Sequence, residues 1–278
     1  MKTEDFTINA RIVNIIDDLK EHFSGKPFII SDVIDDEGHQ YVDLVQEGGG
    51  VLGIALLGYT HVMEQMGIRF LNIGGTSAGA INSLLIAACA TPEHEKTTQI
   101  IDILANKNLY DFIDGDSDAQ DFINTMISDK AGILKLLFKG SQVIDNLKDE
   151  LGLNPGENFH QWLIKVLDDF GIYDTAGLLK RMNQLPASIG YRKNPKGFTQ
   201  FEDRPITSDL AIIAAEVNTE TKVVFPAMRN LFYKNSDQPN PADYVRASMS
   251  IPLFFKPFEI NNLPNGKDVI QDLSLIHI

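Results

Sequence analysis

The stretch "IRFLNIGGTSAGAINSLLIAACA", residues 68–90, decides the fold of this chain. Its first part is rich in β-branched, aromatic and other apolar residues, which favours a buried strand, and its second part has the length and apolar content of a helix. A similar unit precedes it, because a β-rich run at residues 41–45 is followed by three glycines and by a helical pattern at residues 51–66. Strand, helix, strand and helix joined by short connections predict an α/β fold with a mainly parallel central sheet and helices on both faces.

The other segments are arranged around this sheet. Apolar residues at helical spacing predict an amphipathic helix over residues 8–23, and a further β-rich run covers residues 28–33. Residues 106–200 change to helical patterns with acidic and amide-rich joints, which indicates a helical elaboration beside the sheet. Strand-like runs return within residues 210–228. A short helix that starts at Asn240 and Pro241 is then expected to reach Ser248.

The composition excludes several classes of protein. The formal net charge of −14 over 278 residues argues against a chain that wraps nucleic acid, because such chains need a surplus of lysine and arginine. Cys89 is the only cysteine, so no intramolecular disulfide is possible, and its apolar neighbours favour a small buried side chain. The N-terminus has no recognisable signal peptide, and no apolar run approaches the roughly 20 residues that span a bilayer. We expect no transmembrane segment, a cytoplasmic location or export without such a signal, and at most peripheral membrane contact.

The first glycine cluster lies in "EGGGVLG", residues 47–53, between the predicted strand and helix. Glycine leaves the main-chain N–H groups unobstructed and reaches positive φ without strain. Two kinds of anion bind in such loops: the phosphate of a nucleotide, at the N-terminus of the following helix, or the oxyanion that forms during acyl transfer. Gly48, Gly49 and Gly50 are therefore candidate donors to an anion.

The second cluster is a G-x-S-x-G pattern formed by Gly75, Ser77 and Gly79. A nucleophilic serine at a strand-to-helix turn adopts a strained conformation that pushes its Oγ into the open, and the residues two before and two after it must be small. The alternative is an ordinary turn in which Ser77 caps the helix.

The two clusters together favour the oxyanion over the phosphate. Adjacent parallel strands bring both loops to the same edge of the sheet, so the amides of the triple-glycine loop and of Ala78 can point at one oxygen beside Ser77 Oγ. A dinucleotide site would instead place an acidic residue at the end of the second strand, where this chain has Gly74 and Gly75.

At these residues the chain resembles the patatin-like phospholipases. The resemblance is carried, in order, by "GGGVLG", "GTSAG", "GLNPGENFHQWL", "LAIIAAEVNTETKVVFPAM" and "VRASMSIPLFFKPF". It implies a three-layer α/β sandwich and an acyl-ester hydrolase that uses a serine and aspartate dyad without histidine, metal or cofactor. Ser77 then takes the serine position, residues 48–50 the oxyanion loop, and Asp272 in "DVIQD" the aspartate position. The implied substrate is a lipid or phospholipid ester.

Two departures from the family pattern stand out. Leu52 occupies a position where the family usually has a basic residue, and Asp272 is followed by "LSLIHI" instead of a glycine. We interpret these last residues as a truncation, a frameshift or a reading artefact. The expected division is an N-terminal extension over residues 1–42 and a patatin-like domain over residues 43–278, incomplete at its end.

Alternative functions remain open at this point. His277 or His61 would complete a Ser-Asp-His triad of the α/β-hydrolase type, whereas the other four histidines lack any partner pattern. The alternative to a catalytic role for Asp272 is that of a solvated loop residue. A non-catalytic protein that binds lipid or acyl chains on the same fold is the third possibility.

Two segments are candidates for contact with a lipid surface. They are "IPLFFKPF", residues 251–258, and "DKAGILKLLFKG", residues 129–140, which carries Lys130, Lys135 and Lys139 near apolar positions. The same pattern is equally typical of core with a solvated edge. The negative net charge predicts only modest binding to membranes.

Overall fold

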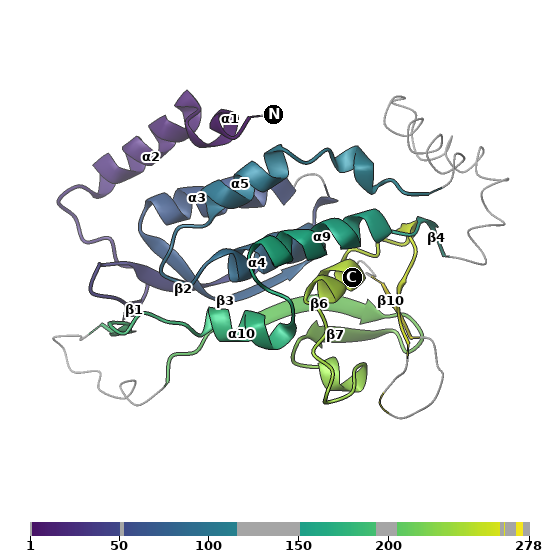
Figure 1. The fold of residues 1–278 in the computed structure, drawn as a ribbon. Helices are drawn as coiled ribbons and strands as arrows, with labels where there is room; N and C mark the ends of the chain where they lie inside the picture. Colours follow the sequence, from purple (N-terminus) through teal and green to yellow (C-terminus); the bar gives the residue numbers. More distant parts are fainter. Residues whose placement is uncertain are drawn as a thin grey trace.

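The computed structural model describes residues 2–50, 53–115, 151–192, 205–261, 264 and 271–274, without the side chains of Leu253 and of residues 271–274. Within these ranges the chain forms a mixed α/β fold in which helices flank a curled central sheet (Figure 1). The fold class expected from the sequence is thereby confirmed.

The central sheet has the strand order β5-β1-β2-β3-β6-β10-β9, with β7 paired to β6 outside this path. Its strands are β1 (Val33–Ile34), β2 (Gln40–Gln46), β3 (Ile68–Thr76), β5 (Gly190–Tyr191), β6 (Leu210–Glu216), β7 (Thr221–Phe225), β9 (Phe258–Ile260) and β10 (Gln271–Ser274). The three strands β2, β3 and β6 pair in parallel, as the strand-helix-strand pattern predicts, and antiparallel strands complete the sheet on both sides. A separate parallel pair joins β4 (Gly152–Asn154) to β8 (Leu253–Phe255).

The helices of the described residues include one after each of the parallel strands β2 and β3, as crossover connections require. They are α1 (Glu4–Thr7), α2 (Ala10–Phe23), α3 (Gly53–Gln65), α4 (Ala78–Cys89), α5 (Thr97–Ala105), α9 (Glu157–Asp169), α10 (Thr175–Met182) and α11 (Ala242–Ser248), with 3-10 turns at Leu109–Phe112 and Arg229–Leu231. Figure 1 shows α2 as an outer layer beyond α3 and α5. Among the described residues, no helix has both the length and the apolar content to cross a membrane.

Helix α4 is the centre of the core. Leu84, Leu85 and Ile86 follow one another along it and are all fully buried, so the helix is enclosed on every side. It packs on β3 and β6 and contacts α3, α5, α9 and α10. The same core contains the stacked rings of Phe225 on β7 and Tyr244 on α11, whose centroids are 4.5 Å apart. This packing fixes the N-terminus of α4 relative to the sheet.

The strand expected over residues 28–33 is wrong except at its end, since β1 is only Val33–Ile34. The side chain of Gln40 explains the difference. Its Oε1 accepts hydrogen bonds from the amides of Ile30 and Ser31, and its Nε2 donates to the carbonyl oxygen of Phe28. One buried amide therefore satisfies the main-chain groups that a sheet ladder would otherwise pair.

A helical elaboration is expected over residues 106–200. The described part of this range contains helices α9 and α10 and the short strands β4 and β5. The lysine-bearing segment 129–140 lies outside the described residues.

Candidate active site

The two glycine clusters lie side by side because β2 and β3 end together. In the parallel register of these strands, Val45 is opposite Gly74 and Gln46 is opposite Gly75. The triple-glycine loop and the turn at Ser77 therefore leave the sheet at one edge, and each leads into a helix. The N-termini of α3 and α4 add positive potential there, because their first N–H groups have no partners within the helix.

Ser77 has a backbone conformation that non-glycine residues rarely adopt. Its φ is +52° and its ψ is −123°, at the single residue between β3 and α4. Its side chain makes no capping hydrogen bond to α4. Capping, the ordinary reason for a serine at a helix start, therefore does not explain this residue, and backbone strain of this kind is typical of functional sites.

The flanking glycines allow the strand, the turn and the helix to pass in close contact. A Cβ atom on Gly75 would lie 2.3 Å from the carbonyl oxygen of Gly79, and one on Gly79 would lie 2.3 Å from the carbonyl oxygen of Gln46. Real Cβ atoms do not approach backbone this closely. Both positions thus exclude any side chain, and Gly79 does so because the end of β2 lies against it.

The triple-glycine loop lies directly against the serine. A Cβ atom on Gly48 would be 2.9 Å from Ser77 Cβ and 3.5 Å from Ser77 Oγ, and one on Gly53 would be 2.7 Å from Ala78 Cβ. Gly50 has a φ of +54°, which a side chain would strain. The structure therefore brings Gly48 to Ser77 and places Gly49 and Gly50 next in the same loop.

Ser77 is covered in this conformation, contrary to the expected exposure of its hydroxyl. The residue is only 1% exposed, and its Oγ lies 3.6 Å from the sulfur of Met249. Its main-chain N–H donates a 2.9 Å hydrogen bond to Oγ of Ser248, which itself donates to the carbonyl oxygen of Ile213 at 2.6 Å. Ser248 and Met249 are residues of the site that the sequence patterns did not single out individually.

Arg246 holds the end of α11 that carries these two residues. Its guanidinium donates to Oγ of Ser250 at 2.6 Å, to the carbonyl oxygen of Lys256 at 2.8 Å and to that of Pro155. These acceptors are neutral, and burial lowers the pKa of Arg246 to about 10. The arginine thus ties α11 to the β4 and β8 region.

A buried amide pair fastens the start of the glycine loop to α4. Nδ2 of Asn82 donates a 2.8 Å hydrogen bond to Oε1 of Gln46, and both residues are at least 96% buried. Gln46 immediately precedes Glu47 and the glycines. The alternation of side chains along a strand would have shown that Gln46 and Leu44 share a face, but it gives no partner on a helix.

Asp272 lies in β10, which joins the sheet next to β6. In β10, Leu273 is opposite Glu216 and Ser274 is opposite Ala215, while Thr76 of β3 is opposite Ile213 of the same strand. The backbone of Asp272 pairs with Glu259 of β9. Its carboxylate is outside the described atoms, so its relation to Ser77 stays a prediction.

No histidine within the described ranges hydrogen-bonds Ser77. His61 bonds Thr97 at 3.0 Å, and His39 and His160 pair with Asp35 and Asp243, each at 2.9 Å. Asp243 is 83 residues from His160, so no sequence pattern predicts that this pair forms. His277 lies outside the described residues.

Within the described residues, neither Cys89 nor a cluster of metal-ligating side chains forms a second reactive centre. Burial raises the pKa of the Cys89 thiol to about 11, which agrees with a packing role. Within the described part of the chain, no group of three or more His, Cys, Asp or Glu side chains is placed to hold a metal ion. In the segment 251–258, Phe255 is buried and Phe258 packs against the core.

The chain is similar to one family model and to two known proteins. The family model "Patatin-like phospholipase" matches residues 44–269. The uncharacterized protein YqhO of Bacillus subtilis (strain 168) is 30% identical over 220 residues, which cover 79% of this chain and 59% of that protein. The crystal structure of VipD from Legionella pneumophila matches with a TM-score of 0.41 at 16% identity, over 93% of this chain and 51% of that one. The chain thus spans little more than half the length of either protein. On the extent of the family match, the chain belongs to the patatin-like phospholipase family.

Proposed function

We propose that the chain is a serine-dependent lipid acyl hydrolase in which Ser77 is the nucleophile and Asp272 is the base. Membership of the patatin-like phospholipase family supports lipid acyl hydrolysis in general. The observation that carries the residue assignment is the +52° φ of Ser77 at a strand-to-helix turn, with Gly48 packed against its side chain. No capping role accounts for that strain.

In the proposed reaction, Asp272 accepts the proton of Ser77 Oγ as Oγ bonds to the ester carbonyl carbon. The carbonyl oxygen becomes negative, and the N–H groups of Gly48, Gly49, Gly50 and Ala78 stabilise it. The C–O bond to the alcohol then breaks, and the alcohol leaves with the proton that Asp272 held. Water adds to the acyl-serine in the same way and releases the carboxylic acid. The mechanism needs no metal or cofactor.

The proposed substrate class rests on the family. We propose a lipid or phospholipid ester, reached from a peripheral membrane surface by a chain without a membrane-spanning helix in its described part. Ser77 is covered in this conformation, so binding of the substrate requires its cover, of which Met249 is part, to open.

Labelling with an active-site-directed fluorophosphonate tests the nucleophile. We expect the wild type to be labelled at one site, Ser77→Ala to be unlabelled, and Ser236→Ala, which changes an exposed serine, to be labelled like the wild type. Asp272→Asn should slow both labelling and the hydrolysis of a p-nitrophenyl ester. Labelling that persists in Ser77→Ala would remove the serine from this role.

The histidine-dependent alternative is tested by the same assay. We expect His61→Ala and His277→Ala to keep at least about half of the ester hydrolysis of the wild type, since a dyad needs no imidazole. The coverage of Ser77 is the one observation that favours a non-catalytic lipid-binding protein. An unlabelled wild type that still binds vesicles of neutral phospholipid would establish that alternative.

A further inference from the structure

A cavity that is open to solvent lies away from the glycine loops, between the N-terminal helices and the α3–α5 layer. It has a volume of about 350 Å³, near the lower end of the range for small-molecule sites. Its lining includes the apolar residues Ile8, Val13 and Ile16, of which Ile8 and Val13 are also exposed to solvent, and the polar residues Asp17, His61 and Gln65. We call it the N-terminal cavity.

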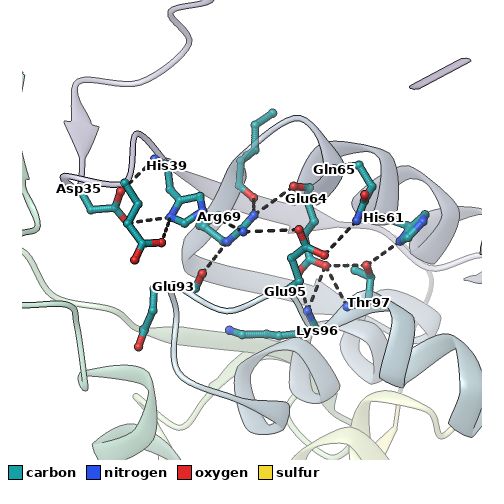
Figure 2. A network of polar contacts seen from close by, with 12 residues as sticks. Asp35, His39, His61, Glu64, Gln65, Arg69, Glu93, Glu95, Lys96 and Thr97 are labelled. Atoms are coloured by element: carbon teal, nitrogen blue, oxygen red, sulfur yellow. Dashed lines mark hydrogen bonds and ion pairs between the residues drawn. The ribbon is translucent and has the colours of Figure 1, made fainter. Parts of the chain in front are cut away.

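The protonation of His61 in this cavity is fixed by a buried chain of hydrogen bonds, shown in Figure 2. The carboxylate of Glu64, which is 2% exposed, accepts from the amide of Thr97 at 2.9 Å and from the Thr97 hydroxyl at 2.5 Å. The proton of the Thr97 hydroxyl is therefore engaged in the hydrogen bond to Glu64. Thr97 Oγ1 can only accept from His61 Nδ1, at 3.0 Å, so His61 carries its proton on Nδ1.

The other ring nitrogen of His61 is therefore a hydrogen-bond acceptor. Within the described ranges Nε2 makes no hydrogen bond, and burial lowers the pKa of His61, which keeps the ring neutral. Gln65 donates its Nε2 to Glu95 at 3.0 Å and keeps its amide oxygen as an acceptor. Asp17 adds an exposed carboxylate from α2.

The polar lining residues thus offer a lone pair, an amide oxygen and a negative charge, and three aliphatic side chains line the same cavity. A primary ammonium has three N–H donors, no acceptor and a positive charge, which matches these groups in hydrogen-bonding character and in sign. A carboxylate would meet the like charge of Asp17 and would find only the Thr98 hydroxyl and the second N–H of Gln65 as donors, because the Thr7 hydroxyl already donates to the carbonyl oxygen of Thr3. The net charge of −14 favours a cation further.

We propose that the N-terminal cavity binds the ammonium head of an aliphatic primary amine, with its hydrocarbon chain against Ile8, Val13 and Ile16. This inference stands on its own contacts and does not depend on the hydrolase mechanism. The carboxylate product of that reaction is negative, like Asp17, so we do not expect it to bind in this cavity.

Calorimetric titration of the full chain at pH 7.5 tests the proposal. We use n-octylamine, octanol and octanoate, which share the hydrocarbon chain and differ in the head group. We expect saturable one-to-one binding of the amine and at least tenfold weaker binding of both other ligands. Equal binding of octylamine and octanoate would overturn the proposal, because it would show that the hydrocarbon alone is recognised.

Two variants locate the site. Asp17→Asn should weaken octylamine binding at least fivefold, whereas Asp18→Asn, the next acidic residue of α2, is not part of the cavity lining and should leave it unchanged. His61→Phe should weaken binding similarly, with thermal unfolding as the check that the chain is folded. Since Asp17 is exposed, its replacement is not expected to disturb the fold, and unchanged binding by Asp17→Asn would place the amine elsewhere.

Discussion

Gly48 and Ser77 are packed so closely that a side chain on the glycine would have to begin 2.9 Å from the Cβ atom of the serine. The two residues are 29 positions apart (77 − 48) and come from neighbouring turns at one edge of the sheet. The contact leaves no room for an intervening group. The position of the glycine loop and that of the serine are therefore set by each other.

Gly48→Ala should reduce catalysis more than stability. The added methyl group meets Ser77 Cβ, so the loop must shift away from the hydroxyl that its amides are proposed to serve. We expect kcat for a p-nitrophenyl ester to fall about 100-fold, with KM changed less than about threefold. Gly58→Ala is the control, because a Cβ there has nothing within 4 Å. An unchanged kcat in Gly48→Ala would contradict the role of the loop.

Gly79→Ala should destabilise the fold itself. Its Cβ would lie 2.3 Å from the carbonyl oxygen of Gln46 and 2.7 Å from that of Glu47, and neither backbone atom can rotate away. We expect the free energy of unfolding in urea to fall by about 2 kcal/mol or more. Gly58→Ala, in the middle of α3, should instead raise it by up to about 1 kcal/mol. A Gly79→Ala variant as stable as the wild type would show that the end of β2 shifts to accommodate the methyl group at little cost in free energy.

Ser248→Ala should lower both stability and turnover. It removes the acceptor of the Ser77 N–H and the donor to the Ile213 carbonyl oxygen, in a place where Ser248 is fully buried. The orphaned groups are expected to cost about 2 kcal/mol in the free energy of unfolding. Because the turn loses a restraint, kcat should fall at least fivefold. Ser236→Ala, at an exposed site, should change neither quantity.

Met249→Ala should speed up the reaction of Ser77 with small probes. The methionine sulfur lies 3.6 Å from Ser77 Oγ, and the serine is 1% exposed. Truncation opens this cover and removes the sulfur to which the Ser77 hydroxyl donates. We expect the second-order rate constant for fluorophosphonate labelling to rise at least threefold. A slower rate would mean that Met249 orders the site instead of covering it. Met228→Ala, a change in the loop after β7, is the control.

Lys96 should give the protein an unusual dependence of stability on pH. Burial lowers the pKa of Lys96 to about 8, against 10.5 for an ordinary lysine. Between these values the unfolded chain keeps the proton that the folded chain has lost, so the free energy of unfolding rises with pH from about 8 to 10.5. The cost of burying the charged ammonium of Lys96 lowers the free energy of unfolding in full only below pH 8, where the folded chain keeps that proton.

The measurement compares wild type with Lys96→Met by urea unfolding at pH 8 and pH 10. The wild type should gain about 2 kcal/mol relative to the variant over this interval. Lys165→Met, which changes an exposed lysine of α9, should show no such relative gain. A difference between wild type and Lys96→Met that stays constant with pH would contradict the lowered pKa.

The central fold was predictable because it depends on local patterns. Residues 68–90 change from strand to helix at one residue, Ser77, and both halves are apolar enough to be buried. The contact of the glycine loop with this turn follows from parallel pairing of neighbouring strands, which sequence order alone favours. Periodicity and loop length were sufficient for these features.

The parts that the sequence did not reveal depend on contacts between distant segments. Gln40 replaces a strand by bonding Phe28 and Ile30, and Ser248 reaches Ser77 across 171 positions of sequence. Neither side chain belongs to a periodic pattern. The cover over Ser77 likewise comes from Met249, whose position depends on how α11 packs on β6. Such long-range polar contacts carry no local signature that a single chain displays.

Ser248 and Met249 are adjacent, yet one holds the main chain of Ser77 and the other shields its hydroxyl. Outward movement of the end of α11 would expose the hydroxyl but would also release the N–H of the strained turn. Rotation about the three flexible bonds of the methionine exposes it without that loss. Admission of an ester to the serine by this route would therefore leave the strained turn and its main-chain hydrogen bond in place.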